Sequence, residues 1–445
     1  MNKKVWLSIV LTLSSLSAGA QTLSFDEVWK DIQKSSLAIK ASNLQVEAME
    51  DSKSRASRHW LPRVYLDGRS YTTNDPGNSF FGILSQRSLQ QADFSPDAIS
   101  HPDAKNYMRG ALGVDFALFE GGMKSAQVDV FKESLDAQKL QKNQIQLDQF
   151  VEVGKSYGSI STLERQKEKL NTLSDQLQKM IRGYQLGSKS NPVGYSGLLG
   201  MKALGNRLSA MLSNYEAQLK SHYGVLRELG LERTTWKPES IEVREFVQSH
   251  FSSQKSDGDS FGLKAQNHQA KAAEHMSKME RARYLPRVGL FAENSMFHGD
   301  RDTANAYTAG VYVQWSLFNP DDYGRYGEAR LKAMAAKAGV EALGQQERAA
   351  VLSMNEQKEA LENGLKLVNE SDDLLVEQTK TTQTLFRNGS ISALQMVEVL
   401  NRRVDLIDQQ SQMELGLLQV SGELLKKEQV NLEAKVVGGK HYDAR

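Results

Sequence analysis

The sequence lacks cysteine and has little proline. Its 445 residues include no Cys and only 8 Pro. Without cysteine the chain can form no disulfide, iron–sulfur cluster or cysteine-ligated zinc site, and it can perform no thiol catalysis. So few prolines permit very long uninterrupted helices, because proline breaks the helical hydrogen-bond ladder. An excess of positive charge is lacking too: 55 Lys and Arg face 54 Asp and Glu, which argues against a nucleic-acid-binding protein.

Motifs for catalysis and for metal binding are also lacking. The eight histidines show no HExxH or other ligand spacing, and residues 194–197 (GYSG) miss the nucleophile-elbow spacing by one residue. His268 and His275 stand two helical turns apart and could share a helix face, where an interhelical or solvated role is expected rather than metal binding. We therefore predict no enzyme, no cofactor and no metal site.

Long apolar runs are absent except near the start of the chain. Residues 1–20 have two lysines, a short apolar stretch and the small-residue end Ala18-Gly19-Ala20, the pattern of a secretory signal peptide cleaved before Gln21. No later segment has an apolar run long enough for a transmembrane helix. We therefore expect an exported protein that could enter a membrane only as a β-barrel.

The remainder of the sequence is duplicated. Three landmarks recur in the same order: residues 60–66 (WLPRVYL) return as 284–290 (YLPRVGL), 114–119 (VDFALF) as 313–318 (VQWSLF), and 184–188 (YQLGS) as 386–390 (FRNGS). Internal repetition of this kind indicates a structural unit used twice. The predicted parts are a first repeat (21–233), a linker expected to lie outside the helical bundle (234–259), a second repeat (260–435) and a polar tail (436–445).

Each repeat contains two segments in which apolar and polar residues alternate, at 63–73 and 107–119 and again at 287–295 and 306–318. Such alternation predicts strands with one apolar and one polar face, and about ten residues is the length of a tilted strand that crosses a bilayer. The alternative is a half-buried hairpin in a soluble sheet. Residues 74–106 have the composition of a long loop. The candidate lipid-facing residues are Val114, Phe116, Leu118, Val313, Trp315 and Leu317.

A long proline-free stretch follows each strand pair. Residues 123–184 keep apolar residues at three-four spacing, which is typical of coiled-coil packing. Residues 323–386 are an equally long proline-free stretch, and each stretch predicts a helix roughly 90 Å long. Gly187 and Gly389 are positioned to end these helices, and return helices are expected at about 193–229 and 392–427. The predicted fold class is mainly α, with transmembrane β-strands and an internally duplicated strand-pair and long-helix unit.

Four strands are too few to close a barrel, and open sheet edges cannot face lipid. Strands from several identical chains would therefore have to join. Two chains would give eight strands and a barrel filled by side chains, whereas three chains would give twelve strands with room for a pore.

In these features the sequence resembles the TolC-type outer-membrane efflux proteins. The resemblance rests on the export signal, the duplicated unit, the LPR segments, Leu118-Phe119-Glu120-Gly121-Gly122 and the two glycine turns. It implies a homotrimer in the outer membrane, with a twelve-stranded barrel in contact with lipid and a helical tunnel in the periplasm. It also implies an exit duct for drugs, toxic ions or secreted proteins, without nucleic acid or nucleotide. The implied partners are a periplasmic adaptor (membrane fusion) protein and an inner-membrane pump of RND, ABC or MFS type.

The resemblance also implies roles for residues at the helix tips. The turns at Gly187, Ser188, Gly389 and Ser390 would dock on the adaptor, and Glu398 with Gln395 would lie at a periplasmic gate. The alternative for Glu398 is an ordinary solvated helix position. Alternatives for the whole protein are a periplasmic adaptor or a structural coiled-coil protein of the envelope.

Overall fold

The computed structural model describes residues 21–185, 187, 189–252 and 258–428. The predicted signal peptide (1–20), Ser188 and the predicted tail (436–445) lie outside the described residues. The chain divides into two compact units. A helical unit is formed by Met1–Ser42, Asn143–Phe261 and Gln345–Arg445, and a sheet unit by Asn43–Lys142 and Gly262–Gly344. Within the described residues, no helix has both the length and the apolar character of a membrane span.

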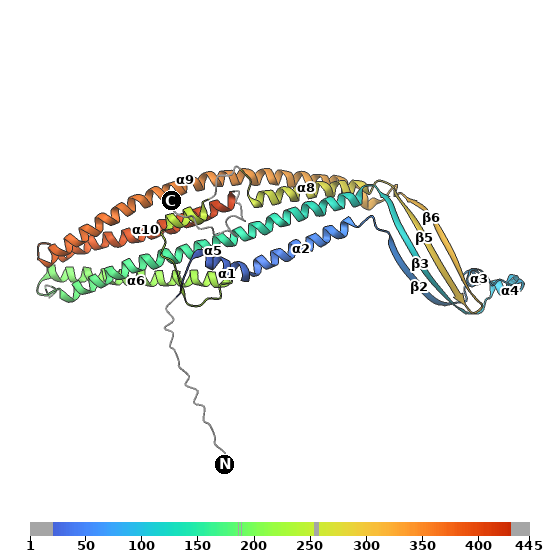
Figure 1. Ribbon diagram of the computed structural model, residues 1–445, viewed down its shortest axis with the longest axis horizontal. Helices are drawn as coiled ribbons and strands as arrows, with labels where there is room; N and C mark the ends of the chain where they lie inside the picture. The colour runs from blue at the N-terminus through green and yellow to red at the C-terminus, as the bar shows by residue number, and fades with distance from the viewer. Residues whose placement is uncertain (1–20, 186, 188, 253–257, 429–445) are drawn as a thin grey trace, which may run out of the picture. The chain divides into compact units, whose positions relative to one another are not determined.

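The sheet unit is built on four antiparallel strands in the order β2-β3-β5-β6 (Figure 1). Their bounds are Arg63–Thr73 for β2, Lys105–Glu120 for β3, Arg287–Gly299 for β5 and Thr303–Gln314 for β6. Each repeat supplies one hairpin, and the two hairpins join where β3 pairs with β5. The remaining elements assigned to this unit include α8 (Phe261–Ala282) and most of α2 (Leu37–Ser57).

The predicted end of the last strand at residue 318 is wrong, because β6 ends at Gln314. The side chain of Trp315 instead donates a hydrogen bond from Nε1 to the Tyr284 carbonyl (3.2 Å), and Pro320 opens the short 3₁₀ turn η3 (Pro320–Asp322). Proline has no N–H for the ladder, so the strand cannot run through it. Trp315 and Leu317 therefore follow the strand rather than belong to it.

The alternation in β3 breaks at a β-bulge. The register of β3 on β5 shifts between Ala117 and Phe119, so that Phe119 lies opposite Val288 and Leu118 has no direct partner. An extra residue of this kind bends the strand and increases its twist. Phe119 therefore takes the position that strict alternation would have given to Leu118, although both side chains are about half exposed.

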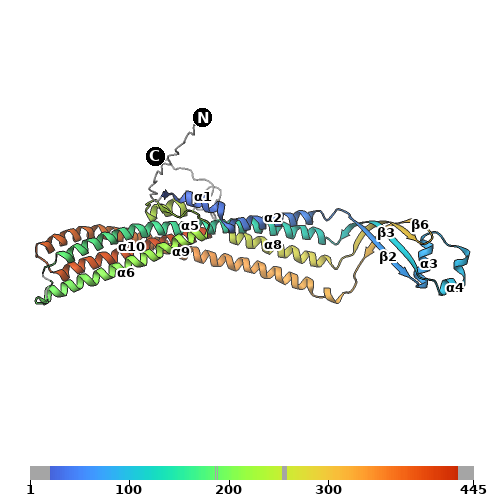
Figure 2. The same cartoon turned by 90° about the horizontal axis from the view of Figure 1, so that it is seen from below.

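The segment 74–106, predicted as a loop, contains three short helices at the end of the sheet (Figure 2). They are α3 (Pro76–Ser85), η1 (Gln91–Phe94) and α4 (Pro96–Ser100). Proline near each α-helix start and the side chains of Asp75 and Ser95, which accept from the backbone N–H groups of the first turns, explain why these helices begin where they do.

An ion pair ties this segment to the turn between β5 and β6. Arg301 donates from both terminal nitrogens to the two carboxylate oxygens of Asp93, each at 2.6 Å, and Asp93 is buried. The buried Gln86 side chain accepts from the backbone N–H of Asp302 at 3.2 Å. Paired guanidinium–carboxylate bonds fix geometry as well as charge, so the segment is held in a single position on the strand ends.

Four long helices dominate the helical unit (Figure 1), and the first and third of them begin in the sheet unit. Their bounds are Met123–Gly183 for α5, Pro192–Glu228 for α6, Arg325–Arg387 for α9 and Ala393–Lys427 for α10. The three-four spacing of α5 buries Phe150, Val153, Tyr157 and Ile160, each at most 2 % exposed. Glycine permits a close helix contact: a Cβ on Gly422 of α10 would lie 2.7 Å from Val151 Cγ1 of α5.

Ion pairs fix the register between these helices. Arg165 of α5 donates to the buried Glu414 of α10 at 2.7 Å, and Lys169 donates to Asp372 of α9 at 2.9 Å. Gln410 accepts from the same lysine at 2.9 Å. Buried charges cost free energy unless they are paired, so a slip of one helical turn would leave charges without partners.

The described residues of the linker 234–259 do not lie outside the helical bundle, contrary to the prediction. Its strand β4 (Trp236–Pro238) pairs in parallel with β1 (Gln21–Leu23), next to α1 (Phe25–Ser35). Its short helix α7 (Val243–Phe246) and the π-helical turn η2 (Val247–Phe251) carry several buried side chains. These are Val243, Phe246, Val247 and Phe251, and Trp236 of β4 is buried as well. These apolar side chains close one side of the core. Polar residues lie between them in the sequence, so their burial is hard to recognise from the sequence alone.

The hydroxyl of Tyr157 joins this small sheet to α5. It donates to the Leu23 carbonyl at 2.8 Å and accepts from the Glu239 N–H at 2.9 Å. The side chain is 1 % exposed, and its ring stacks on Trp236 and Phe246.

Replacing Tyr157 by Phe should destabilise the helical unit by about 1–3 kcal/mol, because two backbone groups lose their partner away from water. Thermal unfolding followed by circular dichroism measures the loss. Tyr195→Phe is the matched control, since no hydrogen bond of its hydroxyl is found among the described residues. Equal melting temperatures for Tyr157→Phe and the unmodified protein would contradict this role.

The Asp93–Arg301 pair should make the segment 74–106 sensitive to acid. The hydrogen bond from Arg301, helped by one from the Gln90 N–H, holds the pKa of Asp93 at about 2, below its ordinary value of 3.8. A depressed pKa contributes stability above the ordinary value, and this contribution is lost as the pH falls through the folded pKa. Pepsin should therefore cut between residues 74 and 106 far faster near pH 2 than near pH 4.

Arg301→Gln should make the segment susceptible to pepsin at both pH values. Asp97→Asn is the control, because Asp97 lies on the same segment and its contact with His101 is exposed. Cleavage of Arg301→Gln at the unmodified rate would show that the ion pair does not hold the segment.

Candidate functional site

The two faces of the four-stranded sheet differ in chemistry. Cross-strand neighbours lie on the same face, and one face collects large apolar side chains that are exposed in the single chain. These are Val64, Leu66, Met108, Leu112, Val114, Leu290, Met296, Tyr307, Val311 and Val313. An apolar area spread over four strands is larger than single chains in water normally expose, and it indicates contact with a partner or with lipid.

The opposite face carries a network of charged and hydroxyl groups. Glu293 of β5 accepts from Arg109 of β3 at 2.5 Å, from the Tyr65 hydroxyl of β2 at 3.0 Å and from Ser295 at 2.7 Å. The Tyr312 hydroxyl of β6 donates to Asp115 of β3 at 3.2 Å, so this hydrogen bond passes over the intervening strand β5. This face can interact with water and ions, since its polar groups are only partly enclosed.

Glycines let the tyrosine rings of this face lie flat on the sheet. A Cβ on Gly113 would lie 2.2 Å from the Tyr65 ring, and a Cβ on Gly289 would lie 2.4 Å from the Tyr312 ring. The same arrangement occurs once in each repeat: a tyrosine ring lies over a glycine on the adjacent strand. A ring that lies flat on the strands projects less from the polar face than a ring that stands upright, so more space remains above that face.

Of the predicted lipid-facing residues, Val114 and Val313 lie on the apolar face and are exposed. Phe116 shares that face through its pairing with Leu290 and is partly buried. Leu118 occupies the bulge. Trp315 and Leu317 are 57 % and 80 % exposed but follow β6, so they extend the apolar area beyond the end of the strand.

The sheet has two open edges. In the part of the chain that the structure describes, β2 pairs only with β3, and β6 pairs only with β5. Each outer strand therefore presents a row of backbone N–H and C=O groups with no strand beside it. Such edges template the addition of a further strand.

The helical unit ends in two hairpin tips, and backbone geometry explains both. In the second tip Gly389 has a φ of +70°, its N–H donates to the Phe386 carbonyl and the Ser390 N–H donates to the Leu385 carbonyl. This is the hydrogen-bond pattern of a Schellman helix end, which glycine favours because it has no Cβ. In the first tip Asn191 caps α6 by accepting from the Gly194 N–H at 3.1 Å.

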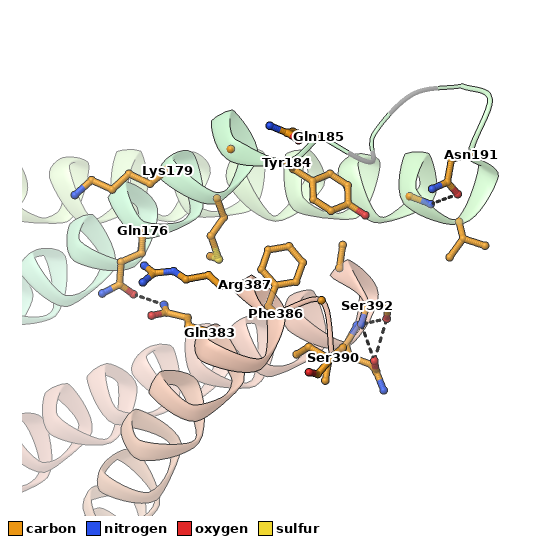
Figure 3. Close-up of a pocket in the computed structure, with 18 residues that line it drawn as sticks. Gln176, Lys179, Tyr184, Gln185, Asn191, Gln383, Phe386, Arg387, Ser390 and Ser392 are labelled. Atoms are coloured by element: carbon orange, nitrogen blue, oxygen red, sulfur yellow. Dashed lines mark hydrogen bonds between the residues drawn. The ribbon is translucent and has the colours of Figure 1, made fainter.

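The two tips enclose a cavity of about 850 Å³ (Figure 3). The rings of Tyr184 and Phe386, which end α5 and α9, stack with centroids 5.8 Å apart. Gln383 donates to Gln176 at 3.1 Å across the cavity wall. The cavity is also lined by residues that the sequence analysis did not single out. These include Lys179, Met180 and Ile391, which lie beside Arg387 of the second glycine turn.

The structure separates the roles of the two predicted gate residues. The Gln395 side chain accepts from the Ser392 N–H at 2.9 Å and completes the capping box that begins α10. Glu398 is 60 % exposed and forms an ion pair with Arg402 at 3.1 Å, one helical turn further on. Sequence reasoning missed Arg402, although its spacing of four residues from Glu398 was a usable signal. Only Glu398 presents an exposed carboxylate.

No protein-family model matches the sequence, and no curated protein matches it closely enough to be informative. Solved structures do match. The channel CusC aligns over 96 % of this chain and 96 % of its own, with a TM-score of 0.76 and 12 % identity.

Two further outer-membrane channels give similar results. MtrE of Neisseria gonorrhoeae covers 90 % of this chain and 88 % of its own (TM-score 0.75, 12 % identity). CmeC of Campylobacter jejuni covers 98 % of this chain and 96 % of its own (TM-score 0.72, 12 % identity). These TM-scores establish the fold. At 12 % identity they do not establish the function, which must be argued from the site. The chain has the mainly helical, four-stranded fold of the TolC-type outer-membrane channels.

Proposed function

We propose that this chain is one subunit of a homotrimeric exit duct in the outer membrane, a passive channel of an efflux or secretion system. The observation that carries the proposal is the open four-stranded sheet, with its exposed apolar face and its polar opposite face. An open edge is excluded from hydrocarbon, because each unpaired backbone group there costs several kcal/mol. Edge β2 of one copy beside edge β6 of the next removes both edges at once.

Three copies satisfy this requirement with a twelve-stranded barrel. The apolar face then contacts lipid, and the network around Glu293 faces the water-filled interior. Eight strands from two copies would leave an interior filled by side chains, whereas the flat rings of Tyr65 and Tyr312 suit an open interior. The related fold of solved outer-membrane channels supports the same arrangement.

The hairpin tips are the proposed docking surface for a periplasmic adaptor protein, which links the duct to an inner-membrane pump of RND, ABC or MFS type. The tip residues concerned are Gly187, Ser188, Gly389 and Ser390, and Ser188 lies outside the described residues. The neighbouring cavity supports this role, because it combines stacked rings with the exposed cations Lys179 and Arg387. An acidic or amide-rich helix end of the adaptor fits such a surface.

Glu398 is the proposed gate residue. In a trimer its three carboxylates form a ring at the periplasmic end, and such rings attract and hold cations. Its pairing with Arg402 reduces the field of each carboxylate. Gln395 acts in the gate only by starting the helix that carries Glu398.

The lipid-facing assignment is tested by a pair of substitutions on one strand. Val311→Arg places a charge on the apolar face, where arginine costs roughly 2–4 kcal/mol at the bilayer midplane. Thr308→Arg places the same charge beside Glu293 on the polar face. Membrane assembly and planar-bilayer conductance should be lost or strongly reduced for Val311→Arg and retained for Thr308→Arg. Equal behaviour of the two variants, or a protein that forms no pores at all, would reject the proposed function.

The gate assignment is tested by Glu398→Ala. Removal of a ring of like charges lowers the local cation concentration, so block by divalent cations should need about tenfold more cation. Conductance of the closed state should rise, because cations held by the ring no longer obstruct it. Glu328→Ala is the control, since Glu328 pairs with Lys332 in the same exposed i,i+4 geometry near the start of α9. Unchanged block and conductance in Glu398→Ala would remove Glu398 from the gate.

A further inference from the structure

Helices α5 and α8 of the sheet unit face each other through a cluster of ionisable side chains. His268 of α8 has its Nδ1 atom 2.8 Å from Glu133 Oε2 of α5. Asp136, one turn along α5, adds a second carboxylate. One ligand-capable atom from each of these three residues lies within 4.8 Å of the other two.

Within the described residues, no Lys or Arg forms an ion pair with either carboxylate of this cluster. Two carboxylates approach one imidazole, and the Glu133 and His268 side chains are only 16 % and 28 % exposed. In the described part of the chain, Asp136 has no hydrogen bond and no ion pair. Lys139, the next cation along α5, is paired with Glu50 at 2.9 Å. Neighbouring carboxylates in a partly buried place repel each other, so the cluster favours a bound cation.

A second imidazole lies along the same seam between the helices. His275 stands two helical turns after His268 on α8, with Nδ1 3.6 Å from Asp129 Oδ2 of α5. That nitrogen is buried and makes no hydrogen bond. The seam therefore presents imidazole nitrogens to carboxylates twice, and one nitrogen is left with hydrogen-bonding capacity unused. A buried polar atom without a partner calls for an explanation such as an ion or a water molecule.

We propose that Glu133, Asp136 and His268 bind a divalent transition-metal ion, with Zn²⁺ as the best-fitting chemistry. One imidazole nitrogen and two carboxylate oxygens are donors that Zn²⁺ accepts at about 2.0–2.2 Å. Tetrahedral ligands at that distance lie roughly 3.3 Å apart, and the ligand atoms of the cluster all lie within 4.8 Å of one another. An imidazole donor disfavours Ca²⁺ and Mg²⁺, which prefer oxygen. Water would complete the coordination.

The sequence alone predicts no metal site here, because His268 and His275 do not have the spacing of metal ligands. The carboxylates come from a helix more than a hundred residues earlier in the chain, so only the folded structure assembles the donor set. Bound metal would link α5 of the first repeat to α8 of the second. Binding to the folded form alone stabilises that form in proportion to the logarithm of metal concentration. This inference does not rest on the channel function.

The test uses the full-length mature protein, purified without a histidine tag. Titration with Co²⁺ followed by visible absorption, and with Zn²⁺ by calorimetry, should show one strong site per chain, and Zn²⁺ should displace Co²⁺. His268→Gln and Asp136→Asn should each weaken binding by at least about tenfold, because each removes a ligand. Zn²⁺ should also raise the melting temperature of the unmodified protein and not that of the variants.

Asp175→Asn is the matched control, an exposed aspartate on the same helix outside the cluster. Circular dichroism checks that each variant is folded. Absence of metal binding in the unmodified protein would overturn the proposal. Binding that is equally tight in His268→Gln and Asp136→Asn would do so as well, since the metal would then be held elsewhere.

Discussion

The two open edges of a four-stranded sheet are the constraint on which the account depends. The backbone groups of β2 and β6 that face outward have no strand beside them in the described chain. Backbone polar groups need partners wherever water is excluded. Ten large apolar side chains are exposed on one face of the same sheet, and an apolar area of this size indicates contact with lipid or a partner. Edge pairing between copies meets both demands together.

The helical unit meets a different demand, which is to keep long helices in register over their length. Apolar spacing alone permits one helix to slip by a turn along another. The ion pairs Arg165–Glu414 and Lys169–Asp372 form in only one register, because a slip would separate the charges. The close contact at Gly422 adds a steric constraint. Helices fixed in this way carry the tips in a defined geometry. The stacked pair Tyr184 and Phe386, at matching positions of the two repeats, shows that the duplication is kept to the end of the unit.

Local periodicity was enough to predict the helices and strands. Features that depend on contacts between distant segments could not be predicted from the sequence. The buried stripe from Phe150 to Ile160 and the glycine turn at Gly389 follow from spacing and backbone preference. The bulge at Leu118 depends on how β3 meets β5, and burial of Phe246 and Phe251 depends on rings supplied by distant segments. In the candidate site, the split between a capping Gln395 and an ion-paired Glu398 needed the helix start to be known. The docking and gating roles remain predictions.

The most direct measurement of the central claim is native mass spectrometry of the mature protein released from detergent micelles. The account predicts a complex of three chains that persists until the detergent or the fold is disrupted. A single chain that remains monodisperse without detergent would contradict it, because the apolar face and both open edges would then be stable in water.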